Sequence, residues 1–457
     1  MPDHRTDPQR SPTALGGRTD SDPTVGAGRP DMSRRRFLAL AGGMATAGML
    51  GAALGPRAWD GLFGASSPVG GAVPDGRLVL VTLYGGNDGM NTVIPYQDPA
   101  YAPARGPLAI DPSTVLPLGE GFGLHPSMPG FKKLWDARQL AVVEGVGFAD
   151  PNFSHFASMD VWQSAVPSGS ESTGWIGRWL DRTPGSPLRA VGIGPTLPVV
   201  LTGDTVQGVT VPAGRLVLPG APEEQALYAA LAGSDHNDAV LLGQAAQSGS
   251  ELLQVHTELG PILDRSATTD PLHLRSAGGT APGAPQGLAI AQGGGGRAGA
   301  GLLATQLSLV ANLILAGASS QVYSCELGGF DTHTDQAPTQ KALLSELDTA
   351  VSAFVEAMAH DPKGRGTVVV VYTEFGRRVG GNASGGSDHG WANAVFAAGP
   401  PVRGGWYGQP PDLAKLSDGN AVYTTDFRSV YATVLGQVVG VDPSSFLQGS
   451  FPALPFL

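Results

Sequence analysis

Four short polar strings, far apart in the chain, carry the side chains best suited to chemistry. They are residues 85–89 (GGNDG), 328–333 (GGFDTH), 373–377 (TEFGR) and 387–390 (SDHG). Three of them come shortly after apolar runs, at residues 78–81, 321–323 and 368–371, which are typical of buried parallel strands. Because open α/β sheets place their sites at the carboxyl ends of such strands, we expect these carboxylates and imidazoles to converge there. This set of side chains favours a divalent metal.

Two Asp-His pairs are the first candidate ligands. Asp331 and His333 are two residues apart, so both point to the same face of an extended segment and can share one cation. Asp335 could add to this pair or orient its imidazole. Asp388 and His389 follow a flexible Gly/Ser loop and precede an apolar run at residues 394–398, which suits ligands on a loop just before a strand.

Asp88 and Glu374 complete the expected ligand set. Asp88 lies on a turn between glycines, where it either binds the metal or stabilises its own loop. Glu374 follows the strongest apolar run of the chain, and Arg377 comes three residues later. An arginine near a metal cluster indicates an anionic substrate group such as phosphate, sulfate or carboxylate. Alternatively, Glu374 and Arg377 form an internal ion pair that orients their loop.

Ser154 is the candidate nucleophile. It precedes His155 where a helix is expected to start, and backbone N–H groups and the helix dipole favour an anion there. A bound metal could activate the hydroxyl and replace a general base. The alternative for Ser154 is a plain N-cap. His155 is a ligand, an acid/base group or a satisfied core histidine, and the sequence leaves these three roles open.

Strands and helices that alternate along the chain must position these residues. Strands are expected over residues 77–83, 140–146, 199–201, 209–211, 321–324, 368–371 and 394–398. Helices are expected over residues 128–137, from the 150–156 segment to 162, and over 223–232, 238–259, 302–316 and 340–359. This alternation predicts an α/β fold with a doubly wound, mostly parallel sheet over residues 59–457. A Gly/Ala/Pro tract at residues 278–301 predicts a loop or linker inserted in that domain.

The first 58 residues stand apart from this domain. Residues 1–31 are rich in Pro, Gly, Asp and Arg without apolar periodicity, which predicts disorder. Residues 33–38 (SRRRFL), followed by a Gly/Ala-rich apolar stretch at 39–54, have the form of a twin-arginine (Tat) export signal. We therefore expect the Tat machinery as a partner and an extracytoplasmic or secreted location. The alternative is a membrane anchor, for which this stretch is marginal.

Charge and cysteine content narrow the classes of function. Residues 59–457 hold 34 acidic and 20 basic residues, a net charge of −14. Such an acidic surface argues against nucleic acid or an anionic membrane as a partner. The chain has one cysteine, Cys325, so it can form no intrachain disulfide and its fold needs none outside the cytoplasm. Its hydrophobic fraction of 42% is enough for one large core.

In their order and surroundings, these strings resemble the DUF1501 family of exported bacterial proteins. That family is placed in the alkaline phosphatase-like superfamily, with sulfatases and cofactor-independent phosphoglycerate mutases. The resemblance extends from about residue 77 to 408. It is carried by residues 83–89 (LYGGNDG), 154–156 (SHF), 329–333 (GFDTH), 373–377 (TEFGR), 388–391 (DHGW) and 404–408 (GGWYG).

The superfamily resemblance implies a two-metal site around a Ser, Thr or modified Cys nucleophile. By this likeness Ser154 takes the place of the nucleophile and Asp88 resembles the aspartate after the first strand. Asp331 and His333 resemble the Asp/His pair of one metal, and His389 resembles its later histidine.

The chain departs from the superfamily pattern at two points. Glu374 stands where the aspartate of an Asp-His pair is expected, and Phe375 takes the place of the histidine, so the second metal loses a ligand. The spacing from Asp331 to His333 is also shorter than usual. One divalent metal is therefore expected, and a second is not supported.

Two functions remain open from the sequence. The first is an exported metal-dependent hydrolase, of the phosphatase or sulfatase type, whose substrate is an anionic small molecule or ester. The second is a non-catalytic exported binding or structural protein that keeps the fold and uses the same residues to hold a structural ion or a loop network.

Overall fold

The computed structural model describes residues 76–167, 171–213, 216, 232–233, 240–266, 268–274 and 302–457. All of them fall within one unit of the chain, Ala72–Leu457. The expected disordered N-terminus and export signal, all but the last residue of the helix expected at 223–232, and the glycine-rich tract at 278–301 lie outside the described residues.

A mostly parallel sheet runs through the described residues. Its central strand β1 (Arg77–Leu83) lies between β8 (Val322–Leu327) and β9 (Thr367–Thr373), and both neighbours are parallel to it. These strands are rich in valine and leucine because both faces of a central strand are covered. The strand order is β11-β5-β10-β9-β1-β8-β6-β7, with β12 beside β5. Only β10 (Asn393–Ala398) runs antiparallel among the described strands of this sheet.

The remaining strands lie at the two sides of this sheet or in a small second sheet. In the main sheet they are β5 (Leu140–Gly147), β6 (Ala190–Ile193), β7 (Val209–Val211), β11 (Gly405–Gly408) and β12 (Thr425–Asp426). The second sheet, in the order β2-β4-β3, consists of β2 (Val93–Ile94), β3 (Leu116–Gly119) and β4 (Phe122–Leu124).

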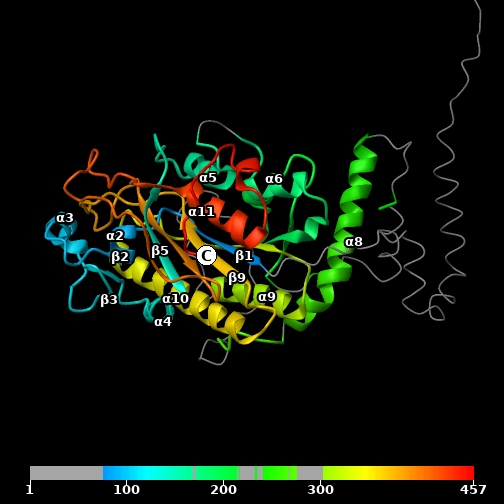
Figure 1. Ribbon diagram of the computed structural model, residues 1–457, viewed down its shortest axis with the longest axis horizontal. Coiled ribbons are helices and arrows are strands. Elements are labelled where there is room, and N and C mark those ends of the chain that lie inside the picture. The colour runs from blue at the N-terminus through cyan, green and yellow to red at the C-terminus, as the bar shows by residue number, and fades with distance from the viewer. Residues whose placement is uncertain are drawn as a thin grey trace, which may run out of the picture. The chain divides into compact units, whose positions relative to one another are not determined.

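Helices cover both faces of the main sheet (Figure 1). One face carries α4 (Pro129–Asp136), α9 (Leu302–Ala316) and α10 (Gln336–His360), and the other carries α5 (His155–Ser164), α6 (Trp175–Arg182) and α11 (Phe427–Val434). Two separate hydrophobic clusters fill the spaces between these helices and the sheet, one around Phe354 and one around Trp162. This arrangement confirms the predicted α/β, mostly parallel, doubly wound fold class.

The other described helices lie beside these layers. They are α2 (Gly89–Thr92), α3 (Tyr101–Arg105) and the long α8 (Val240–Ser266), which packs against α9.

Several expected elements differ from the structure. The strand expected at residues 199–201 is wrong, because Val199–Leu201 forms a single 3-10 turn that begins after Pro198 and buries Val200 and Leu201. Helix α10 begins at Gln336, four residues before the expected start. Helix α8 continues to Ser266, past Pro261, although proline removes one helical hydrogen bond. The described strand β6 and helices α6 and α11 had no expected counterpart in the sequence.

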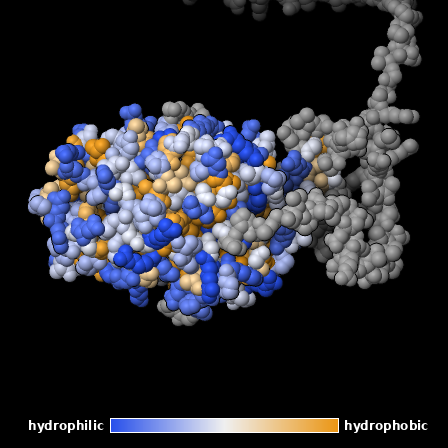
Figure 2. Space-filling view, viewed as in Figure 1, coloured by the Kyte–Doolittle hydropathy of each residue, from blue (hydrophilic) through white to orange (hydrophobic). Residues whose placement is uncertain are grey.

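The visible surface of the described residues is mainly polar. Figure 2 shows hydrophilic residues over most of this face, with apolar residues scattered between them. Among the described residues, no helix is both long and apolar enough to cross a membrane.

The turn after β1 depends on two glycines with positive φ. Gly85 has φ 115° and Gly86 has φ 71°, a region that glycine enters without steric cost. A Cβ atom on Gly86 would come within 2.3 Å of the ring of Phe375, and one on Gly85 within 2.4 Å of the backbone nitrogen of Asp331. These positions therefore let the turn approach the segments that follow β8 and β9.

We predict that Gly86→Ala destabilises the protein more than Gly419→Ala does. Both glycines adopt left-handed conformations, at φ 71° and 76°, but the Cβ position at Gly419 has no neighbour within 4 Å. The conformational cost of about 1–2 kcal/mol is common to both variants. Overpacking against Phe375 should add roughly 1–3 kcal/mol at Gly86 alone. Urea unfolding of the two variants measures this difference, and equal destabilisation would contradict the close approach.

Candidate metal centre

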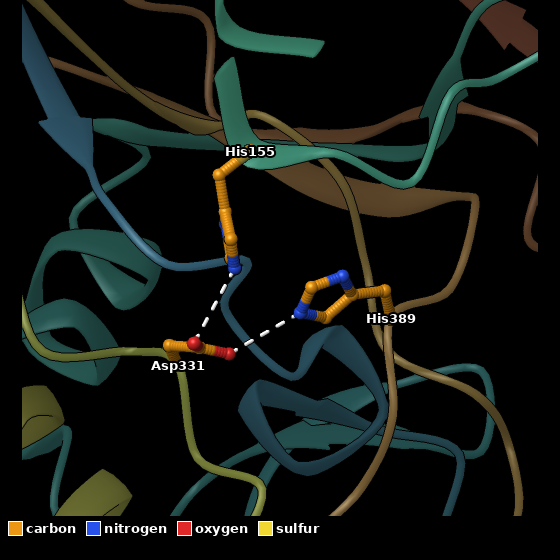
Figure 3. Close-up of side chains that lie close together, drawn as sticks. All are labelled: His155, Asp331 and His389. Carbon is orange, nitrogen blue, oxygen red and sulfur yellow. Dashed lines mark hydrogen bonds and ion pairs between the residues drawn. The ribbon is translucent and has the colours of Figure 1, made fainter. Parts of the chain in front are cut away.

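The chemistry-bearing strings meet at the carboxyl ends of the central strands, as predicted. Asp331 follows β8, Glu374 follows β9, and the Gly85-Gly86 turn follows β1. The first residue of α5 is His155, which reaches the same place from the helical layer, and His389 comes from the loop before β10. Figure 3 shows both imidazoles pointing toward the carboxylate of Asp331.

Three imidazole nitrogens surround the Asp331 carboxylate. Nε2 of His333 lies 3.1 Å and Nε2 of His389 lies 3.3 Å from its Oδ1, while Nε2 of His155 lies 3.4 Å from its Oδ2. Nε2 of His333 and Nε2 of His389 are 2.9 Å apart. Donor atoms of His155, Asp331 and His389 all lie within 4.8 Å of one another. The structure thus brings together four of the predicted site residues.

The opposite nitrogen of each imidazole is held by an oxygen. Nδ1 of His155 lies 2.8 Å from Oε1 of Glu374, and Nδ1 of His333 lies 3.2 Å from Oδ1 of Asp388. Nδ1 of His389 donates to the backbone carbonyl of Phe153 at 2.7 Å, because a carbonyl can only accept. When Nδ1 carries the proton in a neutral imidazole, Nε2 presents its lone pair. All three lone pairs then face Asp331.

This arrangement needs positive charge between its donor atoms. Lone pairs of His333 and His389 that face each other at 2.9 Å, beside a carboxylate, repel unless a proton or a cation lies among them. In addition, Nε2 of His155 is buried, and its contact with Asp331 at 3.4 Å is an ion pair only when the imidazole is protonated. In a tetrahedral site with bonds of about 2.0–2.1 Å, neighbouring ligand atoms are ~3.3 Å apart. The contacts to Asp331, at 3.1–3.4 Å, match this value, and the residues therefore fit one divalent ion.

The ring of Phe375 packs against two imidazoles of the candidate centre. Its ring centroid lies 4.9 Å from that of His155 and 4.7 Å from that of His389, and the phenyl side chain is buried. The phenyl ring removes a possible ligand from this position. It also fixes the planes of the two imidazoles, because ring pairs at this distance are well packed.

The charges around Asp331 shift two pKa values. Burial lowers the pKa of His155, but its hydrogen bonds to Asp331 and Glu374 outweigh burial and raise the pKa to about 9. Burial alone would raise the pKa of Asp331, but hydrogen bonds from His155, His389 and Arg377 hold it well below its usual range. Without a metal, His155 is therefore protonated at neutral pH and Asp331 is ionised.

The role expected for Arg377 as a substrate-binding group requires correction. Its side chain is fully buried, and its guanidinium donates to the carbonyls of Gly85, Gly86, Phe330 and Ser387 and to Oδ1 of Asp331. With these acceptors it has no free face for a substrate anion. The alternative of a pair between Glu374 and Arg377 is also wrong, since the ion pair of Arg377 is with Asp331 at 2.8 Å.

Glu374 and Asp388, which were expected as ligands, instead hold imidazoles of the candidate centre. The carboxylate of Glu374 is buried and accepts from His155, from the backbone N–H of Gly85 and from the hydroxyl of Thr373. Oδ1 of Asp388 contacts Nδ1 of His333 and accepts from Nδ2 of Asn382 at 3.2 Å. Such oxygens orient a ligating imidazole and make it more basic.

Asp88 also requires correction as a ligand. Its carboxylate is buried, caps α2 through the N–H of Asn91, and forms an ion pair with Arg105. Gln336 donates to the same oxygen as Arg105. The alternative that Asp88 stabilises its own loop therefore describes its observed contacts.

Ser154 and Asp335 lie next to the centre without a described side-chain contact to it. Ser154 is exposed at the N-cap position of α5, as its alternative role required, but its hydroxyl makes no capping hydrogen bond. Asp335 is the N-cap residue of α10, in a left-handed conformation at φ 48°, and its side chain makes no capping bond either. Neither an added ligand nor an orienting group is evident at Asp335.

Some site residues gave no signal in the sequence. The Phe153 carbonyl is a backbone group, so no pattern of side chains indicates it. Asn382 lies in the Gly/Ser loop, where a single asparagine is also typical of a turn. His155 was noticed through its neighbour Ser154, but only the fold shows that its imidazole reaches Asp331.

Comparison with known proteins gives the family. The model described as "Protein of unknown function (DUF1501)" matches residues 222–450, half of the chain. The chain belongs to the DUF1501 family. The matched DUF1501 region contains Asp331, His333 and His389 and leaves out Asp88 and His155. No curated protein matches the chain.

Solved structures give more distant similarities. The lipoteichoic acid synthase LtaP from Listeria monocytogenes is 10% identical, with a TM-score of 0.35, over 83% of this chain and 76% of that chain. The PsFucS1 sulfatase from Pseudoalteromonas sp. is 11% identical, with a TM-score of 0.34, over 82% and 70%. Phosphonoacetate hydrolase from Sinorhizobium meliloti 1021 is 15% identical, with a TM-score of 0.27, over 67% and 57%. At these TM-scores none of them decides the reaction of the DUF1501 chain.

The pKa of His155 generates a prediction for protein kept free of metal by a chelator. A pKa raised from about 6.5 to about 9 means that protonated His155 stabilises the fold fully below pH 6.5. That contribution is lost as the pH rises through 9. Thermal unfolding between pH 6.5 and 9 should therefore show falling stability in the wild type and a flatter profile in His155→Gln.

Metal affinity should change in the opposite sense over the same pH range. A metal must displace the proton of His155, so affinity should rise by about tenfold per pH unit up to pH 9. The exposed His360 provides the control. His360→Gln should show the stability profile and the metal affinity of the wild type. Identical stability profiles for His155→Gln and the wild type would contradict the raised pKa.

Proposed function

We propose that this protein is an exported hydrolase of phosphate or sulfate esters that uses one divalent metal ion. His155, His333, His389 and Asp331 would hold the ion. When bound, it supplies a Lewis acid for the anionic ester group and activates a hydroxyl or water. The substrate is proposed to be a small anionic ester, because the ion would be the positive group that faces solvent while Arg377 is fully buried.

The observation that carries this proposal is the shared orientation of the three imidazoles. Each has Nδ1 against an oxygen and Nε2 toward Asp331, and three separate segments of the chain supply them. A solvated polar loop gives no reason for three imidazoles to share this orientation. Ligation of a metal does, since ligating histidines have their second nitrogen held by a carboxylate or carbonyl.

The exposure of the centre favours catalysis over a structural ion. The side chains of Asp331 and His333 are 31% and 42% exposed, so a ligand from solvent can reach them. Four protein ligands would close a tetrahedral site, so catalysis requires that a ligand from solvent replace one of them or add a fifth position. A non-catalytic protein that binds a structural ion is therefore the second candidate.

Ser154 is the proposed nucleophile. It lies between Phe153, whose carbonyl holds His389, and His155, whose imidazole contacts Asp331. Its exposed hydroxyl caps no helix, so no structural role competes with attack on an ester. A water molecule activated in the same centre is the alternative nucleophile.

Purified protein prepared without chelator provides the test. We expect bound divalent metal and turnover of 4-nitrophenyl phosphate or 4-nitrophenyl sulfate. His333→Ala and His389→Ala should each lower metal affinity by ~10–100-fold or more, since even the loss of an outer-shell partner costs that much. His360→Ala, an exposed histidine at the end of α10, should keep both metal and turnover.

Ser154→Ala separates the possible outcomes. This variant should retain the fold, with a change in unfolding free energy within about 0.5 kcal/mol, because Ser154 is exposed and makes no cap bond. Lost turnover with intact metal content supports the serine nucleophile, and retained turnover supports water instead. Bound metal without turnover of any ester in the wild type favours the structural candidate, and metal-free wild type rejects the metal site.

The proposed export of the protein rests on residues 33–54. We predict that replacement of both Arg34 and Arg35 by lysine leaves folded protein in the cytoplasm, because the twin arginine is the feature that the Tat machinery recognises. Fractionation of cells that express the wild type and the double variant measures this effect. Replacement of Arg5 and Arg10, which lie outside the motif, is the control. Normal export of the double variant would rule out Tat.

A further inference from the structure

Asp88 and Arg105 form a buried ion pair near the candidate centre. Their side chains are 1% and 0% exposed. Oδ2 of Asp88 accepts from both Arg105 and Gln336, and Oδ1 accepts from the backbone N–H of Asn91 at 3.3 Å. The carboxylate is therefore neutralised and hydrogen-bonded from within the chain, so a cation at Asp88 does not fit these contacts.

Gln336 connects this pair to the loop that carries two predicted site residues. Its Nε2 donates to Asp88, and its Oε1 accepts from the hydroxyl of Ser387 at 2.5 Å. Gln336 and Ser387 are both fully buried, and Ser387 directly precedes Asp388 and His389. A displacement of Gln336 would therefore also move the loop that carries Asp388 and His389.

Every polar group of Ser387 is bonded to a segment of the centre or to Gln336. Its carbonyl accepts from Nη1 of Arg377 at 2.7 Å, and its N–H donates to the carbonyl of Thr332 at 3.3 Å. Thr332 lies between Asp331 and His333, and Nη2 of Arg377 donates to Asp331 at 2.8 Å. Ser387 thus joins the two segments that carry the ligands.

We propose that Ser387 is a positioning residue of the metal centre, and that the Asp88–Arg105 pair it reaches through Gln336 replaces a second cation. The guanidinium of Arg105 supplies permanently the positive charge that a metal would supply at Asp88. All members of this chain of hydrogen bonds are buried. Their contacts therefore hold the Asp331-His333 segment at a fixed distance from His389. The centre then holds one ion. This inference rests on the proposed metal-binding function.

Removal of Asp88 or Arg105 would leave an unpaired buried charge and would endanger folding, so the test uses milder changes. Ser387→Ala removes one hydroxyl, and Gln336→Met keeps the length of the side chain without its polar atoms. Ser320→Ala is the matched control, since Ser320 is also fully buried but lies before β8, at the end of the strand opposite to the centre.

Zinc titration of chelator-stripped protein is the first measurement. We expect one zinc per chain in the wild type and a ~10–100-fold weaker affinity in both Ser387→Ala and Gln336→Met. The double variant should lose little more than either single variant, because the two residues are direct partners. Ser320→Ala should bind zinc like the wild type. Two zinc ions per chain in the wild type, or unchanged affinity in both site variants, would overturn the proposal.

Amide hydrogen exchange of metal-free protein is the second measurement, and it does not depend on the metal. The N–H groups of Arg378 and Gly390 form hydrogen bonds within the loop between β9 and β10, and the N–H of residue 387 joins this loop to Thr332. They should exchange faster in Ser387→Ala and Gln336→Met but not in Ser320→Ala. If the wild type binds no zinc, the proposed function fails, and exchange alone decides the positioning role. Unchanged exchange in both site variants would overturn that role.

Discussion

The guanidinium of Arg377 is the contact on which the candidate centre depends. It joins the turn after β1, through the carbonyls of Gly85 and Gly86, to the segment after β8, through Phe330 and Asp331. Parallel strands end at one edge of the sheet, but nothing in their ladder fixes the segments beyond it. A planar group with five donors can hold several carbonyls at set angles, which a lysine cannot do. The glycines matter because their carbonyls must turn toward that plane.

The contacts of Arg377 place the carboxylate of Asp331 where several nitrogen atoms surround it. Asp331 contacts the guanidinium of Arg377 and three imidazoles, so its charge is compensated in either state of the centre. Without metal, the proton on His155, whose pKa is raised, supplies part of this compensation. With metal, the ion takes the place of that proton. The same geometry therefore makes stability and metal affinity respond to pH in opposite directions.

The sequence predicted the parts of the fold that simple periodicity controls. The apolar runs at β1 and β9 are buried on both faces, as their continuous apolar sequence predicted. The helix expected over residues 302–316 agrees with α9, Leu302–Ala316. The 199–201 segment failed because three apolar residues fit a turn as well as a strand. The residues of the centre were found because they follow strands. Their roles were not predicted. Glu374 and Arg377 can each face an ion, an imidazole or a carbonyl, and segments remote in the sequence decide which.

Phe375 shows why a lost ligand does not imply a lost site. A histidine at this position could bind a second metal, and a phenylalanine cannot. In the structure its buried ring packs against both His155 and His389 and meets the Gly86 turn. A second ion needs ligands that keep their freedom to bind, whereas here Glu374 is bonded to His155 and Asp88 to Arg105. These contacts commit Glu374 and Asp88 to His155 and Arg105, so the proposed centre is a rigid one with a single ion.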